Sequence, residues 1–308
     1  MSEERVVYLN GEYITESNAK VSIFDRGFLY GDAVYDISRT YHHKPFRLRD
    51  YIDRLWSSLT YTQINPGLTK EEIENIVLEV LNRNVHLLGR NDDYSLVIRI
   101  SRGTDPDVTA KSRPTVVVYC QPIKFRVLAR QYNDGVHVVI SSTRRTPPEC
   151  VSPRAKIQNK INHILAELEA KADDPEAFCI MLDTNGRLAE SSASNFFLVS
   201  KGVLKTSKAD NCLYGRTKLT VLELAKRSGI PVVEDDLEAF DLLTADEAFL
   251  TGTSYAVLPI SRVNSVRLKG PFPGKLTSAI MQEWKKFTGI DLIEQAMIHA
   301  GPEIHATA

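Results

Sequence analysis

The chain has 308 residues, of which 25% are charged, and a formal net charge of -1. This length allows two domains that each have a core of their own. The charge gives no support for nucleic-acid or acidic-membrane binding. No apolar run approaches membrane-spanning length and no signal-peptide pattern starts the chain, so we expect a cytoplasmic protein. The four cysteines are far apart, which favours neither a metal site nor a disulfide framework.

Hydrophobic periodicity predicts a mixture of helices and strands on both sides of a connecting stretch. We predict a small N-terminal domain over residues 1–121, a linker over 122–135 and a larger domain over 136–308. The predicted elements are a strand at 6–9, a loop from 23 feeding a strand at 34–40, helices at 46–56 and 70–88, strands at 94–102, 115–120 and 136–140, a helix from about 159, strands at 178–182 and 195–199, a helix opened by 213–218 and a helix at 275–287.

Lys156 is the first candidate for chemistry. It follows a proline-broken loop and comes just before a predicted helix, so it is surrounded by turn-forming residues rather than placed on an exposed helical face. A lysine held there can be partly desolvated, which disfavours its ammonium form. A neutral amine is what Schiff-base chemistry with a carbonyl or with pyridoxal 5'-phosphate (PLP) requires. On position alone, an ordinary solvated surface lysine is the more common outcome.

A second motif surrounds Glu190. Asn185-Gly186 between two apolar runs is typical of a tight hairpin turn. Glu190 follows in a predicted strand bounded by small residues, which would let a flat ligand approach the backbone.

With these two motifs the chain resembles the fold-type IV, class IV PLP-dependent aminotransferases, the family of branched-chain and D-amino-acid aminotransferases. Lys156 matches the family's Schiff-base lysine, and Glu190 matches the acidic partner of the cofactor's pyridine nitrogen. The resemblance implies an α+β fold with a small N-terminal α/β domain, a larger C-terminal domain and PLP between them. It also implies a homodimer or a higher homo-oligomer with pocket residues shared across subunits.

The resemblance extends to residues that would bind the cofactor's phosphate. Arg54 matches an arginine that contacts phosphate, although a solvated or ion-paired helix residue is the ordinary role of such a side chain. The run 213–218 matches a family turn before a helix, where free amides bind phosphate, but it is also compatible with an ordinary helix start. In this run Arg216 and Lys218 replace the family's usual aliphatic residue and arginine. The implied phosphate ligands are Arg54, Gly215, Arg216, Thr217 and Thr253.

The substrate pocket is less well determined. Neither the branched-chain pattern expected at Ser95 and Val97 nor the D-amino-acid pattern expected at Asp107 and Thr109 is present. Arg99 lies on the same strand face as Ser95 and Val97, where it would either anchor a substrate carboxylate or form an ion pair at a sheet edge. The implied substrate-binding residues are Tyr30, Tyr35, Arg99, Ser254 and Tyr255.

The sequence therefore predicts a ping-pong transaminase that uses an amino acid donor, branched-chain or D, and a 2-oxo acid acceptor. A primary amine is the other donor class considered. Three alternatives stay open: an (R)-selective amine transaminase, a PLP lyase of the aminodeoxychorismate lyase type, and a binding or scaffold protein that has lost the chemistry.

Overall fold

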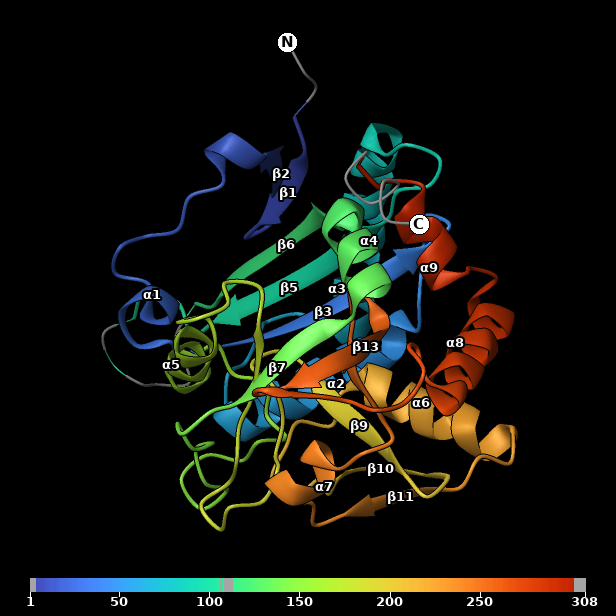
Figure 1. The fold of residues 1–308 in the computed structure, drawn as a ribbon. Coiled ribbons are helices and arrows are strands. Elements are labelled where there is room, and N and C mark those ends of the chain that lie inside the picture. The colour runs from blue at the N-terminus through green and yellow to red at the C-terminus, as the bar shows by residue number, and fades with distance from the viewer. Residues whose placement is uncertain (1–3, 106, 108–112, 302–308) are drawn as a thin grey trace. The chain divides into compact units, whose positions relative to one another are not determined.

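A computed structural model describes residues 4–105, 107 and 113–301 of the chain. The described residues form two compact units, each built on its own β-sheet (Figure 1). The first unit contains the chain up to Ile123 together with Ala155–Lys160, and the second contains Lys124–Arg154 and the chain from Ile161 onward. The predicted α+β architecture is confirmed.

The first unit is a six-stranded antiparallel sheet with helices packed on it. Its sheet has the order β2-β1-β6-β5-β3-β4. Helix α2 packs on β3, and α3 packs on β1 and β6. The elements are β1 (Val6–Leu9), β2 (Glu12–Thr15), η1 (Glu16–Asn18), α1 (Arg26–Tyr30), β3 (Ala33–Tyr41), β4 (Lys44–Pro45), α2 (Leu48–Thr62), α3 (Lys70–Asn84), η2 (Val85–Leu87), β5 (Tyr94–Ser101) and β6 (Thr115–Pro122).

Local sequence signals explain the two long helices of this unit. Helix α3 begins with a capping box, in which the Thr69 hydroxyl accepts from the Glu72 amide and the Glu72 carboxylate accepts from the Thr69 amide. The apolar residues of α3 recur at helical spacing and are buried against the sheet, as predicted for a packing helix. Leu55 of α2 and Ile73 of α3 join one core with Ile98 of β5.

The second unit is a mixed eight-stranded sheet. Its order is β11-β10-β9-β12-β13-β7-β8, with β14 paired to β13. The strands are β7 (Val136–Ile140), β8 (Phe178–Ile180), β9 (Asn195–Ser200), β10 (Val203–Ser207), β11 (Val232–Asp235), β12 (Glu247–Gly252), β13 (Ala256–Val263) and β14 (Val266–Arg267). The helices are α4 (Phe125–Asp134), α5 (Ile161–Ala170), α6 (Arg216–Arg227), α7 (Ala239–Leu243), α8 (Lys275–Thr288) and α9 (Leu292–Met297).

The core of the second unit lies along its central antiparallel strands. Phe197 of β9 and Phe249 of β12 are fully buried and stack with ring centroids 5.1 Å apart. These strands are rich in aromatic and β-branched residues, which suit a sheet that is buried on both faces.

The compact units differ from the predicted domains in two respects. The domain boundaries at residues 121 and 136 remain a prediction. The predicted linker 122–135 contains the helix α4, because Phe125, Leu128 and Tyr132 are buried at helical spacing. Residues 155–160, expected in the larger domain, pack with the first unit. Among the helices in the described part of the chain, none combines the length and the apolar character needed to cross a membrane.

Candidate active site

Lys156 is held by its backbone against the first unit. Its amide donates to the Ser58 hydroxyl of α2 at 3.0 Å, and its carbonyl accepts from the Tyr35 amide of β3 at 3.1 Å. The next residue, Ile157, forms an antiparallel bridge with Val34. The predicted helix starts slightly later than expected, at Ile161. Lys156 is therefore half-buried on an extended segment beside a strand, which fixes where its amine can reach.

The ring of Tyr35 lies beside two cationic groups. The Lys156 Nζ is 4.6 Å from the ring centroid, and the guanidinium carbon of Arg99 is 5.1 Å from it. Arg99 Nε donates to the Tyr119 hydroxyl at 3.1 Å, and Arg99 Nη1 donates to Gln158 Oε1 at 2.5 Å. Since both cations lie within about 5 Å of one ring, the amine and the guanidinium are at most about 10 Å apart. The predicted residues Tyr35, Arg99 and Lys156 thus form one cluster.

Arg99 differs from the other interior arginines of this unit. Arg39, Arg54 and Arg102 each form an ion pair with an aspartate. Arg99 is half-buried and has no carboxylate partner among the described residues. A partly desolvated guanidinium without a counter-ion is a ready binding group for an anion.

Arg54 is buried and already paired with a carboxylate. Its Nε donates to Asp36 Oδ2 at 2.9 Å, and its Nη2 donates to Asp36 Oδ1 at 2.7 Å. Burial alone would lower the pKa of Arg54, but the adjacent Asp36 outweighs this and raises it. The sequence reasoning did not anticipate Asp36, because an acidic residue inside a strand carries no local signal of its partner.

The segment before β3 is anchored through a buried aspartate. Asp25 caps α1 by accepting a hydrogen bond from the Gly27 amide at 2.7 Å. Its carboxylate also accepts from the hydroxyls of Ser101 and Thr115, at 2.8 and 2.6 Å. These contacts tie an exposed segment to β5 and β6.

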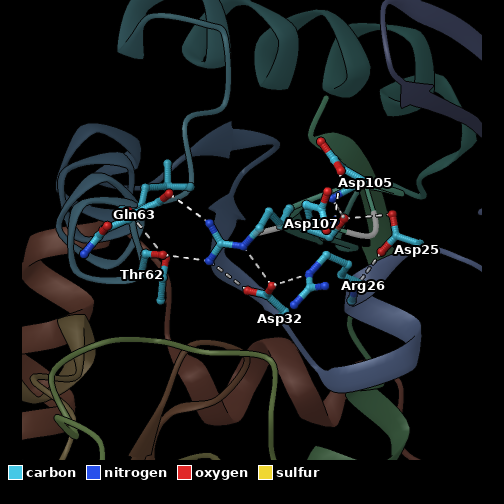
Figure 2. A network of polar contacts seen from close by, with 12 residues as sticks. Asp25, Arg26, Asp32, Thr62, Gln63, Asp105 and Asp107 are labelled. Carbon is cyan, nitrogen blue, oxygen red and sulfur yellow. Dashed lines mark hydrogen bonds and ion pairs between the residues drawn. The ribbon is translucent and has the colours of Figure 1, made fainter. Parts of the chain in front are cut away.

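A second aspartate of this segment accepts hydrogen bonds from two arginines (Figure 2). Asp32 accepts from Arg26 Nε at 2.9 Å and from Arg102 Nε at 2.8 Å. Burial would raise the pKa of Asp32, but these hydrogen bonds hold the pKa below its usual value. The predicted substrate residue Tyr30 is largely exposed, and its ring lies 4.9 Å from the Arg26 guanidinium carbon.

In the second unit, Glu190 is buried, and both of its carboxylate oxygens accept hydrogen bonds. Its Oε1 accepts from Arg145 Nε at 2.9 Å, and its Oε2 accepts from the Leu213 amide at 3.0 Å. His163 Nε2 lies 3.7 Å from the same Oε1. The prediction that Glu190 lies in a strand is wrong: it lies in an irregular stretch between the predicted hairpin turn and β9, where its carbonyl accepts from the Met181 amide but the pairing with the 181–183 segment does not continue as a ladder. The sequence reasoning also missed Arg145.

The turn before α6 has the features of an anion site. The N-cap Gly215 has no side chain to cap the helix, and the first turn holds no acidic residue. A Cβ at Gly215 would come within 2.0 Å of Asn195 Oδ1, so any larger residue here would displace the Asn195 side chain. First-turn amides and the helix dipole favour a bound anion at Arg216 and Thr217.

Lys218, whose role the sequence left open, is paired within the second unit. It is fully buried, and its Nζ forms an ion pair with Glu234 Oε1 at 2.8 Å and donates to the Ser207 carbonyl. Its charge therefore joins α6 to β10 and β11.

The predicted residues Thr253 and Ser254 lie in the turn between β12 and β13. Tyr255 follows, and its hydroxyl shares a short hydrogen bond with Ser194. Burial raises the pKa of Tyr255. A Cβ at Gly252 would come within 2.6 Å of the Tyr255 ring, so this turn also depends on glycine.

Asn195 at the start of β9 links the two turns of the second unit. Its side chain donates to the Leu213 carbonyl at 2.9 Å, and its backbone pairs with Thr251 of β12. The structure thus gathers the predicted residues in two groups. The first unit holds Tyr30, Tyr35, Arg54, Arg99 and Lys156, and the second holds Glu190, Gly215, Arg216, Thr217, Thr253, Ser254 and Tyr255. The family position Asp107 is described, whereas Thr109 lies outside the described residues.

Comparison with known proteins places this geometry in context. A family model described as amino-transferase class IV matches residues 33–263. A putative branched-chain-amino-acid aminotransferase of Methanocaldococcus jannaschii is 36% identical, over 91% of this chain and 95% of its own length. The aminodeoxychorismate lyase of Bacillus subtilis is 33% identical, over 91% and 94% respectively. A crystal structure of the branched-chain aminotransferase from the archaeon Thermoproteus uzoniensis with norvaline has a TM-score of 0.83 and 27% identity, over 96% of this chain and 98% of that one.

Proposed function

Because the chain belongs to the class IV aminotransferase family, we propose that it is a PLP-dependent transaminase that moves an amino group between an amino acid and a 2-oxo acid. The observation that carries this proposal is the chemistry of three groups in the two units: a half-buried amine at Lys156, a buried carboxylate at Glu190 and an uncapped helix start after Gly215. When bound, PLP supplies an electron sink for negative charge on the carbon that bears the amino group.

The roles of the polar residues follow from their donors and acceptors. We assign to Lys156 Nζ the covalent attachment of PLP and the movement of the proton on the donor's α carbon. Glu190 is proposed to face the pyridine nitrogen, since a buried carboxylate favours a protonated ring. The phosphate is assigned to the amides of Gly215, Arg216 and Thr217, and to Arg54 and Thr253.

For the substrate, we propose a donor that carries a carboxylate, either a branched-chain or a D-amino acid. Arg99 supports this choice, because it is a half-buried guanidinium for which no carboxylate partner is found among the described residues, and it shares the Tyr35 ring with the Lys156 amine. Tyr30, Ser254 and Tyr255 are proposed to complete the pocket. With Arg99→Leu, the KM for an amino acid donor should rise at least tenfold while the KM for (R)-1-phenylethylamine stays the same. An equal change for both donors would show that Arg99 does not bind a carboxylate.

Covalent trapping tests the proposed function directly. The purified protein incubated with PLP should show a visible absorption band, and borohydride should fix PLP on the peptide that contains Lys156. Lys156→Ala should lose the adduct and the amino transfer, whereas the neighbouring Lys160→Ala should keep both. A wild-type protein that stays colourless, or an adduct that persists in Lys156→Ala, would refute the proposal.

A lyase is the second candidate, because the Bacillus subtilis relative named aminodeoxychorismate lyase matches nearly as much of the chain. The two functions differ in their need for an acceptor. Product formation from an amino acid donor that depends on an added 2-oxo acid supports the transaminase. Turnover of aminodeoxychorismate without a 2-oxo acid would support the lyase.

We further propose that the protein works as a homodimer or a higher homo-oligomer. Exposed apolar patches of more than a few hundred Å² usually mark interaction sites. The segment between β2 and β3 is anchored to the sheet through Asp25. It exposes six large apolar side chains: Val21, Ile23, Phe24, Phe28, Leu29 and Tyr30. In the second unit, α5 exposes Ile161, Ile164, Leu165 and Leu168 along one helical face.

A further inference from the structure

Arg145 and Glu190 form a buried ion pair within the second unit. Arg145 Nε lies 2.9 Å from Glu190 Oε1, and the two side chains are only 11% and 6% exposed. A cation at this distance favours the ionised form of a carboxylate that burial would otherwise neutralise. His163 also approaches Oε1, but at 3.7 Å it is beyond hydrogen-bond distance. Arg145 is thus a hydrogen-bonded cation that favours the charged form of Glu190.

Both members of the pair are fixed by their backbones. The Arg145 amide donates to the Leu182 carbonyl at 2.8 Å, and the Met181 amide donates to the Glu190 carbonyl at 2.8 Å. Since residues 181 and 182 are adjacent, the two charged residues are attached to the same short piece of chain. The ion pair therefore has little freedom to re-form in another geometry.

The second oxygen of Glu190 continues the connection to the turn before α6. Oε2 accepts from the Leu213 amide at 3.0 Å, and the Leu213 carbonyl accepts from Asn195 Nδ2 at 2.9 Å and from the Gly215 amide at 2.8 Å. The orientation of one carboxylate is in this way coupled to the turn whose glycine starts the helix.

We propose that Arg145 is a positioning residue, which holds Glu190 ionised and oriented and, through Leu213, sets the turn that begins α6. This rests on the proposed function, in which Glu190 faces the pyridine nitrogen of PLP and the turn binds its phosphate. Arg145 touches neither group in this scheme. It acts on both through Glu190, so its loss should change two properties of the bound cofactor at once.

The test uses the full-length protein with Arg145→Met, the conservative Arg145→Lys and the control Arg144→Met, which changes the exposed neighbouring arginine. PLP affinity is measured by titration, and protonation of the ring nitrogen is measured by ¹⁵N NMR of PLP labelled at that atom. Arg145→Met should bind PLP roughly tenfold more weakly, which is the lower end of the loss seen when a residue that orients a metal ligand is removed. Its ring nitrogen should shift toward the neutral form. Arg145→Lys should recover most of both properties, and Arg144→Met should match wild type.

A second readout needs no cofactor. In the protein without PLP, hydrogen exchange at the Leu213 amide should be slow in wild type and at least tenfold faster in Arg145→Met, because the acceptor is no longer held in place. Unchanged exchange together with an unchanged ring nitrogen would overturn the proposal. Failure of wild type to bind PLP would instead refute the proposed function, and the exchange result would still decide the role of Arg145. If Arg145→Met does not fold, Arg145→Gln and Arg145→Lys take its place in the same measurements.

Discussion

Removing Asp93 is expected to destabilise the first unit strongly. Its carboxylate is fully buried and lies 3.5 Å from Arg39 Nη2, whose side chain is only 2% exposed. It also accepts from the Thr40 hydroxyl at 2.6 Å and from the His43 amide at 3.1 Å. Loss of one partner from a buried pair leaves an uncompensated charge and typically costs about 3–5 kcal/mol. We therefore expect Asp93→Ala to lower the free energy of unfolding by about that amount.

The two tryptophans of the chain make this measurement specific. Trp56 lies in α2 of the first unit and Trp284 in α8 of the second, so a Trp284→Phe background leaves fluorescence that reports the first unit alone. Urea unfolding in that background gives the free energy for each variant. The control is Arg49→Ala, which removes an exposed ion pair with Glu74 and should change little.

A double variant measures the coupling between the two charges. Replacing both charges, as in Arg39→Met with Asp93→Leu, should cost less than the sum of the two single changes, because neither buried charge is then left alone. If Asp93→Ala is as mild as Arg49→Ala, or if the single effects simply add, the pair does not stabilise the unit in the way described.

Three further predictions concern acid stability, assembly and thiol reactivity. Burial alone would raise the pKa of Asp32, but two arginines hold the pKa below its usual value. The difference in unfolding free energy between wild type and Asp32→Asn should therefore be largest above about pH 4 and should vanish as the pH falls through the lowered pKa. A difference that does not change with pH in urea titrations would contradict this. Light scattering should find Phe28→Glu, changed in the exposed segment, with a smaller mass than wild type, while Phe240→Glu, at an equally exposed aromatic of α7, keeps the wild-type mass. A thiol reagent at pH 8 should label the exposed Cys150 in the folded protein and spare Cys212, because burial raises the pKa of Cys212 to about 12; rapid labelling of Cys212 would show that its pocket opens.

Local signals made part of this architecture predictable. The spacing of apolar residues in α3 and α8 and the Asn-Gly turn before Glu190 depend only on neighbours within a few residues, and the structure confirms them. Lys156 could be singled out in the same way, since prolines before it and a helix pattern after it limit its conformation.

Long-range pairing was not predictable from one sequence. Arg145 and Glu190 are 45 residues apart and belong to no common periodic pattern, so nothing local indicates their contact. The apolar stripe of α5 shows the opposite problem. The spacing of its apolar residues predicts a helix, but the spacing does not say whether the core of the chain covers that face. In the structure, Ile161 and Leu168 are exposed.

The path of the chain around Lys156 has a consequence for how the protein is made. Residues 155–160 belong with the first unit, although about thirty residues of the second unit precede them in the chain. A nascent polypeptide that ends at Ile123 therefore lacks the strip that bonds to Tyr35 and Ser58, and with it the lysine. A fragment that ends at Ile123 would therefore need residues 155–160 to be supplied as a separate peptide. Such a peptide can be synthesised with a modified amine in place of Lys156.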